Sequence, residues 1–394
     1  MLCNIDLVRL KTLRQSDKVF FKRLLQPIAK KPVLFPFFSL FILLLCIISI
    51  MMKIHKEVTI YDIAKVLGIS PSTVSRGLKD NPGIRKETIK RIRETAHEMG
   101  YQRNKFAGNL RQKHTNTIGV VVPKLNSYFM ATVIAGMEKV TNQHGYGLII
   151  SSSQESVKQE ISCVSTLFNT RVDGLLVSLA LDTRNLDHFN IILNKNIPLV
   201  FFDRISECNS CMSVIIDNFK AGYEVTSHLI EQGCRKIVHL GGNLLSNVYA
   251  ERFRGYKQAL KDNKIIFDEN LVVLSDLSGE SGTETAKKIL SMKILPDGIF
   301  TSNDTSAVAI IIELLKNGIK IPEDIAIAGF NNEPISQVIQ PNLTSVDYPA
   351  REMGEIAALL LINKLRNTQS PNLNTIILKH SLILRQSSLK RNIS

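Results

Sequence analysis

The side chains whose types and spacing suggest chemistry lie between Thr59 and Leu78. From Pro71 onward this stretch carries short polar side chains and one arginine, Arg76, with only Val74 and Leu78 to reach a core. Short polar side chains let a helix enter the major groove of DNA, and an arginine can donate two hydrogen bonds to a guanine edge. The pattern therefore predicts readout of base pairs.

Two short helices joined by a tight turn are expected to hold these side chains. Thr59 can cap the first helix together with Asp62, and Gly68 suits the left-handed turn that ends it. Ser70 can cap the second helix, where Pro71 takes the first position without losing a hydrogen bond. The buried face of the first helix would consist of Ile60, Ile63, Ala64 and Leu67. A generic helical hairpin is the alternative, but the caps, the turn and the polar second helix agree with a helix-turn-helix.

The basic charge of the chain is confined to its front. The 394 residues carry a formal net charge of +14, of which residues 1–52 hold +6 and residues 53–115 hold +8, whereas residues 116–394 are neutral. A local positive region on a neutral body suits a polyanionic partner such as DNA. The length allows two or three domains with full cores.

A third helix is expected from Lys86 to Met99, with Gly100 at its end. Its apolar stripe would consist of Ile89, Ile92, Ala96 and Met99. With this element in place, residues 58–110 resemble the DNA-binding head of the lac repressor family of bacterial transcription regulators. The matching segments are Val58–Ala64, Ser70–Arg76, Gly100–Tyr101 and Asn104–Leu110.

The resemblance implies that the head binds double-stranded operator DNA through both short helices, the following loop and a hinge. The positions that it places on DNA are Thr59, Tyr61, Ser70, Pro71, Ser72, Thr73, Ser75, Arg76, Lys79, Arg85, Thr88, Asn104, Ala107 and Leu110.

The last matching segment is the hinge. In the family it becomes helical on the operator, and a leucine from each of two subunits wedges into the minor groove; Leu110 stands at that position. Arg103 replaces a usual proline and Gly108 a usual longer polar residue. Because glycine costs about 1 kcal/mol in a helix interior, this hinge helix should be weak without DNA. A plain linker with a chance leucine is the alternative.

Residues 116–394 alternate apolar runs with helical stretches, which predicts α/β units with buried parallel strands. The expected strands form two series, residues 118–122, 147–150, 174–177 and 199–202, and then residues 237–240, 271–274, 298–300 and 325–328. Two series joined near Asp217 indicate two lobes with a ligand cleft at the carboxyl ends of the strands. The body resembles, to about Arg385, the periplasmic sugar-binding protein fold that the lac repressor family uses as its effector domain.

Polar side chains follow several of these strands and suit hydrogen bonds with a polyhydroxylated ligand. The resemblance places five residues at effector-contact positions: Phe129, Asp203, Arg252, Asn303 and Asn331. An asparagine or aspartate after a strand can instead be only a helix cap. The family often has two aspartates where this chain has Asn331 and Asn332, which makes a simple neutral sugar a poorer match.

No catalytic, metal or cofactor site is predicted, because the sequence contains no nucleophile elbow, P-loop or zinc-spaced histidine pair. The six cysteines show no regular disulfide spacing, which indicates a reducing cytosol. Cys208 and Cys211 form a C-x-x-C motif without a second pair of ligands, so a zinc or redox role is not expected.

The front of the chain contains an uncharged, mostly apolar run, Pro32–Met52, that is long enough to span a bilayer. Eight Lys and Arg residues precede it, so the positive-inside rule would export the DNA-reading helices. Met51 and Met52 stand directly before Lys53, a natural start for the next domain. We therefore interpret residues 1–52 as an extension from a wrongly chosen start codon, with a membrane tether as the alternative.

The predicted organisation is a helix-turn-helix domain at residues 53–102, a hinge at residues 103–115 and a two-lobed effector and dimerisation domain at residues 116–394. The expected function is that of a cytoplasmic, nucleoid-associated repressor, a homodimer that responds to a sugar or related metabolite. Residues 381–394 lack the leucine heptads of a coiled-coil tetramer. The alternatives are a membrane-tethered sensor regulator and an exported solute-binding protein, of which the DNA-binding head argues against the second.

Overall fold

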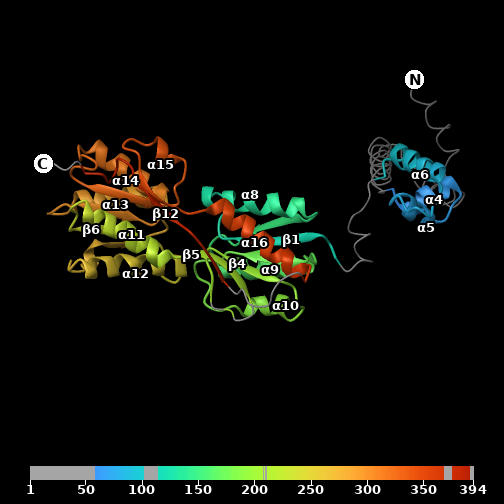
Figure 1. Cartoon of the computed structure of the whole chain (residues 1–394), viewed down its shortest axis with the longest axis horizontal. Coiled ribbons are helices and arrows are strands. Elements are labelled where there is room, and N and C mark those ends of the chain that lie inside the picture. Colours follow the sequence, from blue (N-terminus) through green and yellow to red (C-terminus); the bar gives the residue numbers. More distant parts are fainter. Residues whose placement is uncertain (1–57, 102–113, 207, 209–210, 368–374, 391–394) are drawn as a thin grey trace, which may run out of the picture. The chain divides into compact units, whose positions relative to one another are not determined.

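The computed structural model describes residues 58–101, 114–206, 208, 211–367 and 375–390 (Figure 1). The chain divides into two compact units, Met1–Asn104 and Lys105–Ser394. The predicted extension 1–52 and the hinge residues Asn104, Ala107 and Leu110 lie outside the described residues. Within the described ranges, no helix combines the length and apolar character needed to cross a membrane.

Three helices form the first unit: α4 (Ile60–Leu67), α5 (Pro71–Gly77) and α6 (Lys86–Glu98). The predicted caps are confirmed. Thr59 donates its N–H and its O–H to Asp62 Oδ2, at 2.9 and 2.7 Å. Gly68 ends α4 in the left-handed conformation, with φ of 67°. Ser70 Oγ accepts the N–H of Thr73 at 3.1 Å and so caps α5.

A small core joins α5 to the other two helices. Ile63 on α4, Val74 on α5 and Ile92 on α6 are fully buried and pack together. Gly77 permits this packing, because a Cβ atom at that position would collide with Ile92 Cδ1. The buried side of α5 is thus fixed, and its other side is free to carry polar residues.

The second unit contains two six-stranded sheets, one in each lobe (Figure 1). The first sheet has the order β11-β5-β4-β3-β1-β2, and every neighbouring pair is parallel. Its strands are β1 (Thr117–Val122), β2 (Gly147–Ser152), β3 (Gly174–Val177), β4 (Leu199–Phe202), β5 (Met212–Ile216) and β11 (Thr375–Leu378). The helices of this lobe are α8 (Tyr128–Gln143), α9 (Val157–Asn169), the short η4 (Asp187–Phe189), α10 (Asn190–Leu193) and α16 (Ala350–Leu365).

The second sheet has the order β12-β10-β9-β8-β6-β7, with β12 antiparallel to β10 and the other pairs parallel. Its strands are β6 (Ile237–Gly241), β7 (Val272–Leu274), β8 (Gly298–Thr301), β9 (Ala326–Phe330), β10 (Thr344–Asp347) and β12 (Ser381–Ile383). The helices of this lobe are α11 (Asn218–Glu231), α12 (Asn247–Asp262), the short η5 (Glu269–Leu271), α13 (Gly279–Leu290), α14 (Asp304–Lys316) and α15 (Ile335–Val338).

The chain passes between the two lobes three times. It leaves the first sheet after β5, returns from β10 into α16, and leaves again from β11 to β12. In Figure 1 helix α16, in red, accordingly lies beside α8 in the first lobe. The predicted junction near Asp217 is therefore only the first of three crossings.

All eight predicted strands are present, but four strands were missed: β5, β10, β11 and β12. β10 (Thr344–Asp347) and β12 mix polar with apolar residues and lack a long apolar run, whereas the short apolar runs of β5 and β11 were overlooked. The prediction that residues 147–150 are buried is wrong, because β2 is an edge strand and its residues are exposed or half-buried. Leu271 lies in η5, so β7 is shorter than predicted.

Asp173 holds the residues that directly precede β1. Its side chain is only 4% exposed. Its carboxylate accepts the N–H of Thr115 at 2.9 Å and the N–H of Asn116 at 2.7 Å. Thr115 also donates its O–H to the Arg171 carbonyl oxygen at 2.8 Å. These bonds fix the residues directly before β1.

Cys208 and Cys211 form a disulfide, which corrects the expectation that the cysteines are unpaired. Their Cα atoms lie 5.4 Å apart, a usual separation for bonded cysteines. The expectation rested on the lack of several pairs at regular spacing, and one pair three residues apart escapes that criterion. Cys163 and Cys234 are free.

Candidate functional sites

The head presents a polar surface along α5. Ser72 and Arg76 on this helix are exposed or half-buried, and Lys79 just after it is exposed. Tyr61, on the neighbouring α4, is 67% exposed although it is a large ring. The remaining described candidates are also at least partly exposed: Thr59, Ser70, Pro71, Thr73, Ser75, Arg85 and Thr88. Every predicted DNA-contact residue that the structure describes is therefore at least partly exposed and can be reached by DNA.

Arg76 differs from the cations of α6. Arg93 donates to Asp80 at 2.6 Å, and Lys90 lies 3.9 Å from Glu94. The Arg76 side chain forms neither a hydrogen bond nor an ion pair with any residue that the structure describes. Its guanidinium can therefore form two hydrogen bonds with a guanine edge without giving up an existing partner.

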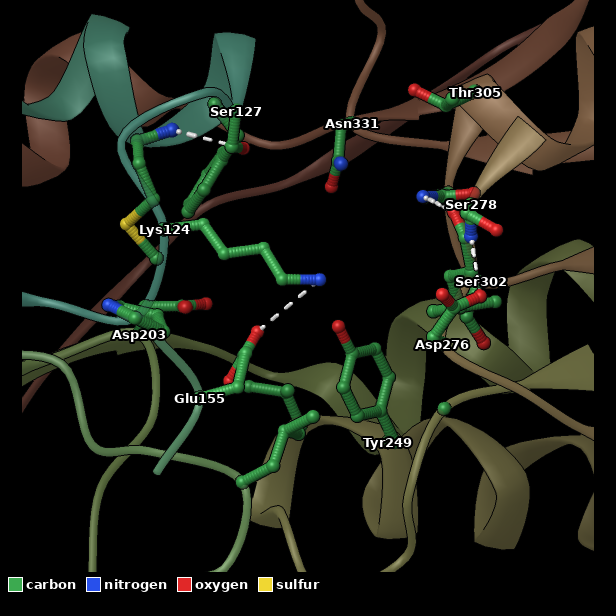
Figure 2. A pocket seen from close by; sticks show the side chains of 18 of the residues that line it. Lys124, Ser127, Glu155, Asp203, Tyr249, Asp276, Ser278, Ser302, Thr305 and Asn331 are labelled. Atoms are coloured by element: carbon green, nitrogen blue, oxygen red, sulfur yellow. Dashed lines mark hydrogen bonds and ion pairs between the residues drawn. The ribbon is translucent and has the colours of Figure 1, made fainter. Parts of the chain in front are cut away.

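A cavity of about 340 Å³ lies between the lobes of the second unit (Figure 2). Its walls are formed by segments that follow strands of both sheets and by the first turns of α8 and α12. All five predicted effector residues line it: Phe129, Asp203, Arg252, Asn303 and Asn331. Residues from distant parts of the chain thus meet where a ligand cleft was expected.

Asp203 supports the wall of the cavity. It follows β4 with φ of 59°, and its side chain accepts hydrogen bonds from Tyr348 at 2.8 Å and Ser178 at 3.3 Å. Burial raises the pKa of Asp203, while neighbouring Arg204 and the bond from Tyr348 oppose that rise. The ring of Tyr348 in turn lies against Phe129, with centroids 4.5 Å apart. Asp203 therefore positions two rings that face the cavity.

Arg252 is held rigidly although it is charged and only 3% exposed. Its Nε donates to Asn218 Oδ1 and its Nη1 to the Ser302 carbonyl oxygen, both at 2.9 Å. The guanidinium carbon lies 3.5 Å from the centroid of the Phe330 ring, a close cation–π contact. Burial lowers the pKa of Arg252, but an arginine stays protonated in proteins.

Close packing of α11 against α12 brings Arg252 to Asn218. A Cβ atom at Gly222 would collide with the Arg252 carbonyl oxygen, and one at Gly255 would collide with the Phe219 carbonyl oxygen. The two glycines therefore allow the backbones to approach until Arg252 reaches the start of α11.

Two neighbouring residues in the wall, Arg252 and Ser302, keep hydrogen-bonding capacity. Arg252 Nη2 has no partner among the described residues, and neither has Ser302 Oγ, whose residue is 1% exposed. Buried polar groups in folded proteins are normally hydrogen-bonded. This pair of groups can therefore receive a ligand oxygen, and Ser302 is a candidate that was not predicted from the sequence.

The two asparagines play different parts. Asn303 caps α14: its Oδ1 accepts the Ser306 N–H at 3.0 Å, and its Nδ2 donates to the Leu277 carbonyl oxygen at 2.8 Å. Asn303 therefore caps a helix and also lines the cavity, and its contact with an effector stays a prediction. Asn331, with φ of 101°, points into the cavity (Figure 2), and burial raises the pKa of Glu333, which also lines it.

A charged network at the cleft was also missed. Arg204 donates to Glu155 Oε2 at 2.6 Å and to Tyr249 Oη at 3.2 Å. Lys124 extends into the cavity (Figure 2), with its Nζ 3.8 Å from Glu155 Oε1. Because Arg204 belongs to the first lobe and Tyr249 to the second, the network joins the lobes. Lys124 and Glu155 come shortly after β1 and β2. A search for polar residues that follow strands, which selected Asp203, could therefore have found them.

Two family models match the chain: residues 59–104 match bacterial regulatory proteins of the lacI family, and residues 226–388 match a periplasmic binding protein-like domain. Catabolite control protein A of Priestia megaterium is 30% identical over 333 residues, which cover 84% of this chain and 99% of the relative. The chain belongs to the lacI family of bacterial regulatory proteins.

Other lacI-family relatives agree. The HTH-type transcriptional repressor PurR of Vibrio atlanticus is 30% identical over 332 residues, 84% of this chain and 98% of that protein. A solved structure of the transcriptional regulator CelR with cellobiose is 25% identical and covers 84% of this chain and 100% of its own, with a TM-score of 0.64.

Membership of the lacI family makes this chain a DNA-binding transcription regulator with an effector-binding body. The predicted fold class, an all-α helix-turn-helix head with a two-lobed α/β periplasmic-binding-protein-like domain, is confirmed. Catabolite control protein A and PurR are regulators, not enzymes.

Proposed function

We propose that this lacI-family chain is a repressor that acts as a homodimer and is controlled by a sugar or related metabolite in its cleft. The convergence of five predicted effector residues on one cavity between the lobes carries the proposal. A ligand that contacts both lobes favours the lobe arrangement that it binds better, and this preference can be coupled to operator affinity. Similarity to PurR, named a transcriptional repressor, supports repression.

On the DNA side, α5 reads base edges in each half-site. Arg76 donates to a guanine, while the small polar residues Ser72, Thr73 and Ser75 let the helix enter the major groove. The other contact candidates position the head, and Leu110 of each subunit opens the central base step. The accessibility of Arg76 and its lack of partners among the described residues support this assignment.

In the cleft, the effector binds Arg252 Nη2 and Ser302 Oγ, two groups that have no partner among the described residues. Phe129, Tyr249 and Tyr348 supply rings for its apolar faces. Similarity to CelR, solved with cellobiose, supports a sugar. Because Lys124 and Glu155 add charge to the cavity, charged sugars belong among the compounds tested.

A homodimer is supported by an apolar patch on the second lobe. Ile312 and Leu315 on α14 and Ile335 and Val338 on α15 are exposed, and the two helices pack side by side. Two copies of this patch related by a twofold axis would bury it. The same axis would present two heads to a pseudo-palindromic operator.

The test combines ligand and DNA binding on residues 53–394. A thermal-shift screen of sugars, nucleosides and sugar phosphates identifies a ligand, and fluorescence anisotropy then measures operator affinity with and without it. Arg252→Ala should weaken ligand binding at least about tenfold, because a buried charged hydrogen bond contributes roughly 1.5–3 kcal/mol. Operator affinity without ligand should stay nearly unchanged.

The matched control is Arg366→Ala, which removes an exposed arginine at the end of α16. It should leave both titrations unchanged. If Arg252→Ala also binds the ligand normally, Arg252 is not part of the effector site.

We also infer that residues 53–394 are the functional unit, acting on DNA in the cytoplasm, with the head, hinge and body bounded at residues 102 and 115. A membrane tether formed by residues 32–52 is the alternative. Cell fractionation with mass spectrometry decides between them. Membrane sedimentation together with peptides from residues 1–52 would establish the tether and reject the start-codon interpretation.

A further inference from the structure

A second concave surface lies on the second lobe, and none of its lining residues belongs to the cleft. It is a groove of about 730 Å³ between α12 and the loop that follows it. Arg254, Lys257 and Lys261 lie along one face of α12, at the i, i+3 and i+7 positions, and the loop adds Lys264. All four are exposed, and no carboxylate is among the described residues that line the groove.

The acidic residues nearest in sequence do not neutralise three of these cations. Glu251 pairs with Arg254, Asp262 accepts from Gln258, and Asp268 accepts from the Asn270 backbone. In the part of the chain that the structure describes, Lys257, Lys261 and Lys264 have no ion-pair partner. The groove therefore presents four cations, three of them without an ion-pair partner among the described residues.

The floor of the groove is aromatic. Lys257 Nζ lies 4.9 Å from the ring centroid of Phe267 and 5.5 Å from that of Phe253, and the Arg254 guanidinium carbon lies 5.2 Å from that of Phe219. Cation–π contacts of this kind hold cationic side chains over ring faces. The charges are thus presented at the rim of an apolar surface.

One apolar side chain of the groove is almost fully in water. Ile266 is 92% exposed and follows Lys264, whose φ of 57° turns the loop. A single exposed isoleucine is common on protein surfaces. Beside three phenylalanines and four cations, it gives a partner apolar area to cover as well as charge to neutralise.

We propose that this groove, formed by Phe219, Phe253, Arg254, Lys257, Lys261, Lys264, Ile266 and Phe267, binds an acidic segment of a partner protein through one aromatic or aliphatic anchor residue. Charge complementarity requires the acidic character, and the ring floor with Ile266 requires the anchor. The chain's own front is excluded as the occupant, because residues 1–52 carry a net +6. A DNA backbone would satisfy the cations but leave Ile266 uncovered.

The experiment uses the full chain and four fluorescent peptides of equal length. One peptide is rich in aspartate and glutamate with a central phenylalanine; the others replace that phenylalanine by serine, the acids by glutamine, or both. Anisotropy titrations should show binding of the first peptide, weaker by about tenfold when either element is removed and weaker at higher salt.

Variants then locate the binding. Lys257→Glu combined with Lys261→Glu should weaken the first peptide by at least about tenfold, and so should Ile266→Ser. The matched control, Lys287→Glu combined with Lys288→Glu, reverses two exposed lysines on α13 and should change nothing. Operator binding and the melting temperature should stay the same in all variants, which shows that they remain folded.

Three results would overturn the proposal: equal affinity for acidic and glutamine peptides, peptide binding that the groove variants do not change, or displacement of the peptide by a duplex lacking the operator. The last result would reassign the groove to DNA. None of these outcomes depends on an effector, so the proposal stands or falls separately from the function of the cleft.

Discussion

Tyr348 donates its phenolic O–H to Asp203 Oδ1 at 2.8 Å, and this bond joins the end of β4 in the first sheet to the segment after β10 in the second. Both residues are buried beside the cavity, at 3% and 4% exposure. The bond therefore links the wall of the effector cleft to one of the three chain crossings between the lobes.

Tyr348→Phe should weaken effector binding and lower the free energy of unfolding by about 1–3 kcal/mol. It removes the O–H but keeps the ring, so the buried carboxylate of Asp203 loses its shorter hydrogen bond. Isothermal titration and urea unfolding measure the two effects. Tyr223→Phe is the control, because the Tyr223 hydroxyl has no hydrogen bond to a described residue. Equal losses in both variants would contradict a specific role for the Tyr348 bond.

His239 should make the body sensitive to acid. It is fully buried on β6, neither ring nitrogen has a partner among the described residues, and burial lowers its pKa to about 3, with nearby Arg252 adding to the effect. The folded state keeps this ring neutral, whereas the unfolded chain protonates it below its ordinary pKa of 6.5. Its contribution to stability is therefore present above pH 6.5 and is lost as pH falls towards 3, by up to about 1.4 kcal/mol per pH unit.

The comparison with His239→Phe isolates this effect. Burial raises the pKa of Asp304 to about 7, so Asp304 favours the folded state as pH falls from 7 towards its ordinary value of 3.8 and acts against His239. Urea unfolding between pH 7.5 and 5 should show that the advantage of His239→Phe over the original chain grows as pH falls. A constant difference between the two proteins would show that His239 does not titrate on unfolding.

Arg76→Ala should reduce operator affinity by about 1–3 kcal/mol per half-site and relax the base preference at one pair. Arg93→Ala is the control, because Arg93 is exposed on α6 but already pairs with Asp80. Binding-site selection on both variants gives the preference at each base. An unchanged preference with Arg76→Ala would remove Arg76 from base readout.

Leu110→Ala should weaken operator binding and reduce DNA bending while leaving the half-site preferences unchanged. Leucine forms no hydrogen bond with a base and would act by holding open a central step. A gel-based bending assay on a permuted set of operator fragments measures the change. Normal bending, or altered half-site preferences, would mean that Asn104–Leu110 is only a linker.

Val338→Glu should dissociate the dimer and weaken operator binding. Val338 is 73% exposed on α15, which packs against α14, and a carboxylate there would have to be buried at a twofold interface. Analytical ultracentrifugation gives the dissociation constant. Ile294→Glu changes a similarly exposed apolar residue of the same lobe and should remain dimeric. A dimeric Val338→Glu protein would place the interface elsewhere.

The head could be predicted in detail because its signals are local. Thr59, Gly68 and Ser70 each act within a few residues, and the structure places each at its expected cap. The need for glycine at position 77 could not be predicted in the same way, because it arises from contact with Ile92 on another helix. Helix caps and turns can be predicted from neighbouring residues in the sequence, whereas close packing between two helices cannot.

The cleft was predicted where residues directly follow apolar strands, as Asp203 and Asn331 do. Tyr348 was missed because it follows β10, whose mixed composition hid the strand. Arg204 and Tyr249 were missed because their role depends on a bond between lobes, which no spacing along the chain encodes. Asn303 shows that one side chain can cap a helix and also line the cavity, so its contact with an effector stays a prediction.

The Asp173 carboxylate accepts hydrogen bonds from two successive backbone N–H groups immediately before β1. Residues 115 and 116 are therefore fixed to the first lobe. Any rotation of the first lobe must carry residues 115 and 116 with it as a rigid extension of the sheet. In a dimer, the spacing between the two linkers would then follow the angle of the lobes directly. A change in the lobe angle on effector binding would then displace the two linkers relative to each other. A longer or more flexible segment at residues 114–116 would reduce this displacement.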